Sequence, residues 1–263
     1  MLIDTHCHLT FPDFEKDRDD VIMRAHQAGV LKMISIAVSV KDFVPLVKLC
    51  QEYPSSIFCS IGIHPCSAHE EMEVSVDELV CMASHPSVVA LGETGLDCYH
   101  AVHRLQDQKT VFLRHIEAAR ITGIPLVIHS RSADEDMSII LQEEMKKGSF
   151  SFVIHCFSAT QKMAEICLDL GGYISFAGIV TFSKLDNLRN IAKTIPMNRL
   201  LVETDAPFLA PVPWRGKRNE PSYVVNTANI LAKERQITYE EIMEKTTENA
   251  MRLFSKMSEC VAS

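Results

Sequence analysis

The feature that most constrains the fold of this chain is a repeated alternation of short apolar segments with longer segments of helical periodicity. Eight short segments rich in β-branched residues each precede a segment in which apolar residues recur every three or four positions. The expected strands are 2–7, 32–38, 57–63, 88–93, 125–129, 152–155, 172–176 and 200–203. The expected helices are 15–28, 41–52, 75–84, 104–121, 133–147, 160–170, 184–194 and 222–235. This order predicts parallel strands joined by helical crossovers.

Eight such units in 263 residues favour a closed barrel, because about 250 residues is the usual size of a (β/α)₈ TIM barrel. Periodicity does not show whether the sheet closes into a barrel, so an open doubly wound sheet stays an alternative. The sequence contains no linker or low-complexity segment, and we therefore expect a single α/β domain that spans residues 1–263. A further helix at 239–254 is expected to pack under the barrel.

Charge and cysteine content limit the classes of function. The formal net charge is -8, which argues against a protein that holds long duplex DNA by charge alone. The N-terminus MLIDTHCHLTF lacks the features of a signal peptide, and no apolar run approaches the ~20 residues that cross a bilayer. The nine cysteines form no CxxC pair, which favours reduced thiols in the cytoplasm or nucleus. We expect a monomer without membrane contact.

Residue types that bind metals gather at the carboxyl ends of the expected strands. In a barrel these ends surround one site, because all the strands point the same way. The candidate metal ligands are His6, His8, Glu93, His129, His155 and Asp205. Side chains alternate along a strand, so His6 and His8 are expected on one face, where two imidazoles can chelate one cation. An isolated His-x-His pair would predict little, and the other four ligand types give it weight.

Two divalent ions are expected in this site. His129 and His155 end consecutive strands and could hold a second cation, with Glu93 placed to bridge. Imidazole suits zinc and carboxylate suits magnesium or manganese, so the identity of the metal stays open. Asp205 emerges from a buried strand, and a cation would offset the cost of burying its charge. We assign catalytic roles to Asp205 and Glu93, and a supporting role to Glu203, which faces the same way one layer deeper.

Other chemically active residues are assigned by their position. Cys7 and Cys156 adjoin expected ligands, but strand alternation turns both away from the barrel axis, so we interpret them as buried structural thiols. His64, in a Gly-Ile-His-Pro turn, could contact substrate or simply cap its loop. The remaining histidines that lack a strand-end position are expected to be surface or structural residues: His69, His85, His100, His103 and His115.

The segment 214–221, WRGKRNEP, is the one dense cationic loop and follows the eighth strand. Arg215 and Arg218 are the candidate substrate-binding residues here, because arginine beside an aromatic ring can hold a phosphate and stack on a base. The alternative is a solvated loop before a helix, since Glu220-Pro221 is typical of a helix start.

The motifs IDTHCHL, GIHP, ALGETGLD, PLVIHSR, IHCFS, ETDAPFL and RGKRNEP occur in order along nearly the whole chain. In these motifs the sequence resembles the TatD-type metal-dependent deoxyribonucleases, within the amidohydrolase-like barrels, and most of all their vertebrate members. The resemblance implies a (β/α)₈ fold, divalent cations at the six positions named above, and hydrolysis of DNA phosphodiesters, often from the 3′ end. The segment 98–103, CYHAVH, departs from the aromatic and acidic loop of many relatives, which leaves the shape of the substrate channel open.

The sequence therefore predicts a metal-dependent hydrolase of DNA phosphodiester bonds, a 3′–5′ exodeoxyribonuclease that favours single strands or 3′ ends. Metal-bound water, whose pKa falls from about 15.7 to near 7, would supply the hydroxide. The first alternative keeps the metals and cleaves a small ester, an amide or an aminoacyl-tRNA bond, which the negative net charge favours. The second is a non-enzymatic binding scaffold, against which the intact ligand set argues.

Overall fold

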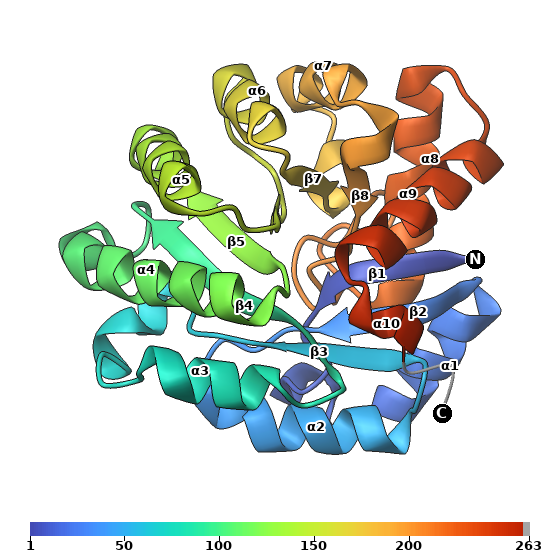
Figure 1. Cartoon of the computed structure of the whole chain (residues 1–263). Coiled ribbons are helices and arrows are strands. Elements are labelled where there is room, and N and C mark those ends of the chain that lie inside the picture. Colours follow the sequence, from blue (N-terminus) through green and yellow to red (C-terminus); the bar gives the residue numbers. More distant parts are fainter. Residues whose placement is uncertain (260–263) are drawn as a thin grey trace.

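A computed structural model of the protein describes residues 1–259 and contains one sheet of eight parallel strands in the order of the sequence (Figure 1). The strands are β1 Leu2–Cys7, β2 Val30–Ser35, β3 Ile57–Ile61, β4 Val88–Asp97, β5 Leu126–Arg131, β6 Phe152–Ile154, β7 Tyr173–Phe176 and β8 Leu200–Val202. Each strand is hydrogen-bonded to the next, and helices surround the sheet, as the alternating pattern predicts.

The helices that follow the strands lie where the periodicity predicts them. They are α1 Arg18–Gln27, α2 Phe43–Glu52, α3 Val76–Ala83, α4 Leu105–Thr122, α5 Asp134–Lys147, α6 Gln161–Asp169, α7 Asp186–Thr194 and α8 Val224–Arg235. Two more, α9 Tyr239–Leu253 and α10 Lys256–Glu259, end the described chain. Within residues 1–259, no helix is both long and apolar enough to cross a membrane.

The seam between β1 and β8 nearly closes the ring, which decides between the two architectures that the pattern allowed. Cys7 forms a parallel bridge with Ala206, and the His8 N–H donates to the Ala206 carbonyl at 2.8 Å. One layer below, the buried Asp4 carboxylate accepts hydrogen bonds from the Thr204 N–H at 2.9 Å and hydroxyl at 2.5 Å. Backbone and side-chain bonds together join the edges, so the fold is a (β/α)₈ barrel.

The amino end of the barrel is closed by an apolar plug. Residues that alternate along the strands fill the interior, among them Ile3, Phe58 and Val127. Phe254 and Met257, both fully buried, extend this cluster from the region of α9 and α10. The final helices therefore pack under the barrel, as expected, and the carboxyl ends of the strands form the open end.

The largest departure from the expected elements is in β4, which continues four residues past the predicted end at Glu93. It pairs with β5 from Thr94 to Asp97 after a shift in register. Gly95 permits this pairing, because its φ is +136° and a Cβ atom there would overlap the carbonyl oxygen of His129. The extension places the Asp97 carboxylate beside the site.

Candidate metal centre

The alternation of side chains along the strands places apolar residues in the core and also positions the ligand residues of the site. Val127 and Val153 belong to the inner apolar cluster, and two residues later His129 and His155 point into the mouth of the barrel. In β1 the alternation changes, because the register between β1 and β2 is irregular between Asp4 and Cys7. His6 and His8 consequently face the other ligands.

Asp205 lies just beyond β8 in a conformation that few residue types adopt. Its φ is +60°, in the left-handed region that aspartate tolerates better than most residues. A hydrogen bond from its N–H to the His6 carbonyl, 2.8 Å long, holds this turn against β1. The turn directs the carboxylate at the two histidines of β1.

Four ligand atoms form the first group. The Nε2 atoms of His6 and His8 are 3.3 Å apart, and Asp205 Oδ1 lies 3.5 Å from each. Glu93 Oε2 lies 3.3 Å from His6 Nε2 and 3.9 Å from His8 Nε2. Four ligands at about 2.1 Å from a tetrahedral cation are separated by about 3.4 Å, so these atoms have the spacing of ligands around one ion.

The second group forms around the other oxygen of Glu93. Glu93 Oε1 is 2.8 Å from both His129 Nδ1 and His155 Nε2, and these two nitrogens are 3.3 Å apart. The two oxygens of one buried carboxylate thus face separate groups of imidazoles. This is the arrangement that a carboxylate bridging two neighbouring cations requires.

The charges of the site fit a bound cation. Burial raises the pKa of Glu93, but the charges and hydrogen bonds of His155, His64 and His129 outweigh it and hold that pKa well below its usual range. Burial likewise opposes ionisation of Asp205, and the hydrogen bond and charge of His8 lower its pKa overall. Neither carboxylate pairs with a lysine or arginine among the described residues, so only imidazoles face them, and bound metal ions would offset the buried negative charge when these imidazoles are neutral.

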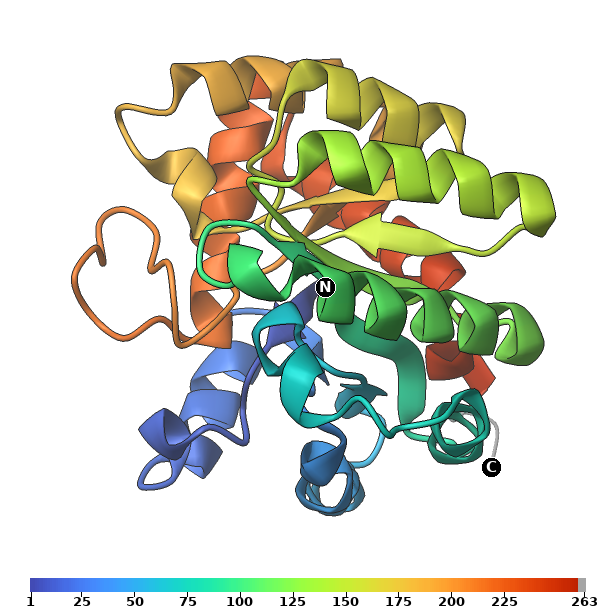
Figure 2. The same cartoon turned by 90° about the vertical axis from the view of Figure 1, so that its left-hand side faces the viewer.

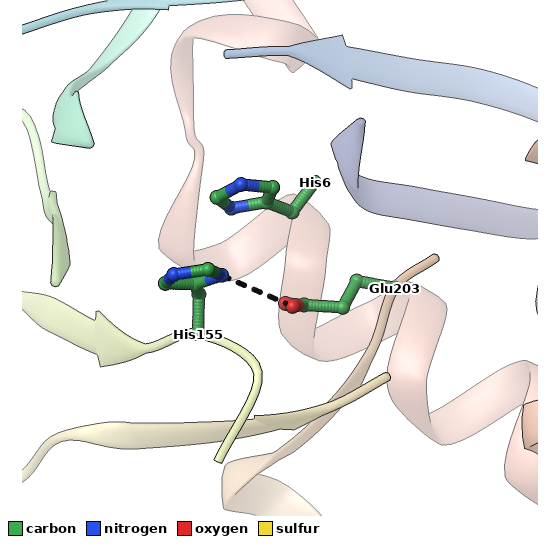
Figure 3. A group of neighbouring side chains, drawn as sticks. All are labelled: His6, His155 and Glu203. Atoms are coloured by element: carbon green, nitrogen blue, oxygen red, sulfur yellow. Dashed lines mark hydrogen bonds and ion pairs between the residues drawn. The ribbon is translucent and has the colours of Figure 1, made fainter. Parts of the chain in front are cut away.

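Two more carboxylates orient the imidazoles. Glu203 Oε1 lies 3.3 Å from His155 Nδ1 and accepts a hydrogen bond from the Cys156 N–H at 2.7 Å, and Figure 3 shows it beside the stacked rings of His6 and His155. The supporting role of Glu203 stays a prediction, since Glu203 also lies with His6 and His155 in a group that could hold a metal ion. Asp97 Oδ2 lies 3.1 Å from His129 Nε2. Such partners fix the ring of a metal-binding histidine.

A cavity of about 520 Å³ opens over the ligands. Its lining includes one residue whose predicted place was wrong. Cys156 lines the cavity because β6 ends at Ile154 and the chain turns at Cys156 with a φ of +42°, where strand alternation no longer applies. His100 is exposed, as expected of a surface residue, and it also borders the cavity, where its Nδ1 lies 2.9 Å from Oδ2 of Asp97 at the end of β4.

His64 combines the two roles that the sequence left open. Its Nδ1 accepts a hydrogen bond from the Cys66 N–H at 3.1 Å and so caps the following turn. Its Nε2 faces Glu93 Oε1 at 3.5 Å, and the ring lines the cavity. Burial lowers the pKa of His64 to about 4. The ring is therefore neutral at physiological pH.

The structure does not bring Arg215 and Arg218 into the cavity. The Arg218 guanidinium bonds to both carboxylate oxygens of Asp17 at 2.7 Å, and the Arg215 guanidinium lies 4.0 Å from the centre of the Phe182 ring. The loop that carries them stands out from the barrel (Figure 2). Asn219 fastens its end, because its side-chain amide donates to the carbonyls of Thr204 at 2.9 Å and Phe208 at 2.6 Å.

The lining residues that were missed from the sequence include Asp97, Arg131 and Phe208. Asp97 and Arg131 are register partners at the ends of β4 and β5, both of which were expected to stop earlier. The signal was present in the motifs GLD and HSR, where each residue follows a candidate ligand by an even number of positions. Phe208 lies in an irregular loop, and no periodicity reports its direction.

A family model described as "TatD related DNase" matches residues 3–255. The chain is 40% identical over 256 residues to the "Uncharacterized metal-dependent hydrolase YcfH" of Escherichia coli, covering 96% of this chain and 95% of that protein. It is 40% identical over 255 residues to YabD of Bacillus subtilis, with 97% and 99% covered. The "3'-5' ssDNA/RNA exonuclease TatD" of Salmonella typhimurium is 32% identical over 258 residues, with 96% and 98% covered. These relatives are bacterial, and the likeness to vertebrate members stays a prediction.

Solved structures show the same architecture. The TatD homologue YjjV from Escherichia coli superposes with a TM-score of 0.89 at 28% identity, over 97% of this chain and 98% of that one. A TatD family hydrolase from Entamoeba histolytica gives a TM-score of 0.82 at 24% identity, over 96% and 97%, which bears on the fold alone.

Proposed function

Because this chain belongs to the TatD-related DNase family of metal-dependent hydrolases, we propose that it cleaves DNA phosphodiester bonds, removing nucleotides from the 3′ end of single strands. One observation carries the proposal. A buried carboxylate, Glu93, shares its two oxygens between two groups of histidines at the base of an open cavity. The name of the Salmonella relative, an exonuclease of single-stranded DNA and RNA, supports the choice of substrate.

The residues that would hold two divalent ions divide into the groups described above. His6, His8 and Asp205 would hold one ion, His129 and His155 the other, and Glu93 would contact both. Bound Mg²⁺, Mn²⁺ or Zn²⁺ would lower the pKa of a water molecule and neutralise charge on the attacked phosphate. All six ligands come from one chain, so the proposed unit of function is the monomer.

The protein groups account for the movement of protons. The carboxylate of Asp205 lies at the cavity and has a lowered pKa, so it is ionised at neutral pH and can accept a proton from the attacking water. The water oxygen forms a bond to phosphorus, and the bond from phosphorus to the 3′ oxygen of the next nucleotide breaks. Asp205 then returns the proton to that 3′ oxygen, which balances the hydrolysis. Neutral His64 bounds the other side of the cavity.

A small ester, an amide or an aminoacyl ester is the second candidate substrate. Arg131 is the single lysine or arginine among the described residues that line the cavity, whereas a site for a long nucleic acid contacts many phosphates. This observation favours either a small substrate or the extreme end of a strand.

The test is release of nucleotides from end-labelled single-stranded DNA by metal-stripped protein to which magnesium, manganese or zinc is restored. We expect metal-dependent release of mononucleotides from the 3′ end and none by the Asp205→Asn variant. Turnover by the folded variant would contradict the role of Asp205. Failure of the wild-type protein with every metal would favour the second candidate.

A further inference from the structure

The cavity has two chemically different walls. In a closed ring of eight strands taken in order, β1 and β8 lie opposite β4 and β5 (Figure 1). The loops after β1 and β8 contribute Phe11 and Phe208 to the lining, and the ends of β4 and β5 contribute Asp97 and Arg131. The ligand groups lie between these walls, so a bond cleaved there has one wall on each side.

The wall at β1 and β8 is aromatic. The Phe11 ring stacks on His8 with centroids 4.6 Å apart and an angle of 23° between the planes. The Phe208 ring meets both Phe11 and His8 edge-on at 6.1 Å, and 51% of Phe208 is exposed. An exposed ring beside a reactive centre gives a nucleobase a surface on which to stack, and such stacking does not depend on the identity of the base.

The wall at β4 and β5 carries one free cation. The Arg131 guanidinium lies 5.3 Å from the centre of the exposed Tyr99 ring and, within residues 1–259, pairs with no carboxylate. Its register partner Asp97 is committed elsewhere, because Oδ2 contacts His129 and His100 while Oδ1 accepts the N–H groups of Tyr99 at 2.9 Å and His100 at 2.7 Å. Arg131 therefore keeps its donors for an anionic ligand.

We propose that the cavity binds the last two phosphates of a DNA strand end, with the terminal base on Phe208 and Phe11 and the neighbouring, uncleaved phosphate on Arg131. This inference rests on the proposed nuclease function and assigns the two subsites of its substrate. The terminal phosphodiester lies at the ligand groups, and the rest of the strand leaves past β5. A guanidinium suits the outer phosphate because it donates in a bidentate geometry. One arginine suffices, since a single phosphate enters beyond the cleaved one.

The test compares three substrates that differ in one feature each. A thymidine pentanucleotide has a base and further phosphates, thymidine 5′-(p-nitrophenyl phosphate) has a base and one phosphate, and methyl p-nitrophenyl phosphate has neither a base nor a second phosphate. Arg131→Gln should lower kcat/KM on the pentanucleotide by about tenfold or more, with a change within about twofold on the other two. Phe208→Ala should lower kcat/KM on both thymidine substrates by about fivefold or more and leave the base-free ester unchanged.

Arg199→Gln is the matched control. Arg199 also lies over a tyrosine, 4.9 Å from the centre of Tyr173, but just before β8 at the amino end of the barrel. The Arg199→Gln substitution removes the same charge outside the cavity and should leave kcat/KM unchanged on all three substrates. Arg131→Lys should restore part of the pentanucleotide rate, and thermal unfolding of each variant checks that it folds.

A binding measurement separates the two levels of the proposal. The probe is a labelled pentathymidylate whose terminal linkage is a phosphorothioate, which keeps its charge and resists hydrolysis. Binding by metal-loaded protein that weakens about tenfold in Arg131→Gln but not in Arg199→Gln supports the subsites, even if no substrate is hydrolysed and the nuclease function fails. Hydrolysis of the pentanucleotide that is equally fast in Arg131→Gln, or a loss equal on all three substrates, overturns the subsites and leaves the nuclease function standing.

Discussion

The two ends of the barrel use the same strands for opposite purposes. At the amino end, Ile3, Phe58 and Phe254 exclude water from a packed apolar layer. At the carboxyl end, the same alternation presents imidazoles and carboxylates to an open cavity. Burial stabilises the first set and opposes ionisation of the second. The packed apolar end therefore supplies the rigidity that holds the unfavourably buried charges in place at the other end.

Substitution at the carboxyl end should affect activity far more than stability. Glu93→Gln removes the charge that both ligand groups share, so we expect loss of bound metal and a fall in turnover of about 10³-fold or more. Its thermal stability should match that of the metal-free wild-type protein. Metal analysis of the purified variant and a melting curve check this. Retention of both ions would break the assignment of Glu93 as the shared ligand.

Glu203→Gln should have a smaller effect than Glu93→Gln. Glu203 contacts His155 on Nδ1, the ring nitrogen that does not face Glu93. We expect metal affinity or activity to fall by about 10- to 100-fold, as is typical when the partner of a metal-binding histidine is changed. Titration of the stripped variant with Zn²⁺ measures it. An effect as large as that of Glu93→Gln would place Glu203 among the ligands themselves.

Substitution at the amino end should do the reverse. Phe254→Ala removes a fully buried ring from the plug, and we expect the free energy of unfolding to fall by about 3–5 kcal/mol. The kcat/KM of the molecules that stay folded should be unchanged at 20 °C. Urea unfolding and an activity assay on the same sample test both parts, and a selective loss of activity would show that the plug shapes the site.

A buried histidine that does not line the cavity gives a smaller, pH-dependent effect. His115 Nδ1 is 2.8 Å from the Val111 carbonyl, Nε2 accepts from the Ile63 N–H at 3.3 Å, and burial lowers the pKa of His115 to about 4. The unfolded chain binds this proton near pH 6.5 and the folded chain only near pH 4, so stability from this residue is complete above pH 6.5 and is lost as the pH falls toward 4. The loss amounts to about 3 kcal/mol.

His115→Gln keeps a donor and an acceptor but cannot titrate. The difference in the free energy of unfolding between wild type and this variant should therefore change between pH 7 and pH 4.5, in the direction of a relative gain for the variant in acid. Urea titrations at the two pH values measure it. A difference independent of pH would mean that folding does not shift the pKa of His115.

The smallest effect is expected in the loop after β8. Arg218→Gln breaks a half-exposed ion pair with Asp17, which should cost about 0.5–1 kcal/mol of stability. Because the guanidinium is turned away from the cavity, kcat/KM on single-stranded DNA should stay within about twofold of wild type. A loss of kcat/KM above about tenfold would show instead that Arg218 contacts the substrate.

The sequence predicts this fold well because its signals are periodic. The bounds of β1 agree with the structure, and the six ligand candidates converge because each lies within two residues of the end of an expected strand. Where the backbone departs from regular strand geometry, sequence periodicity no longer predicts the direction of a side chain. Cys156 and Asp205 have positive φ, so their directions depend on turns that no local pattern specifies, and the continuation of β4 through Gly95 was not expected either.

The cationic loop shows a different limit. Its composition suggested phosphate binding, whereas the partners of Arg218 and Asn219 lie far away in sequence, at Asp17 and Thr204. A charge pattern reports which residues can bind an anion. The tertiary structure decides which of them are already paired.

The most direct test of the central claim, a pair of cations that share Glu93, is anomalous diffraction from crystals soaked in Mn²⁺. We expect two peaks, one within reach of His6, His8 and Asp205 and one within reach of His129 and His155, on opposite oxygens of Glu93. A single peak away from Glu93, or none in a soaked crystal of active protein, would contradict it.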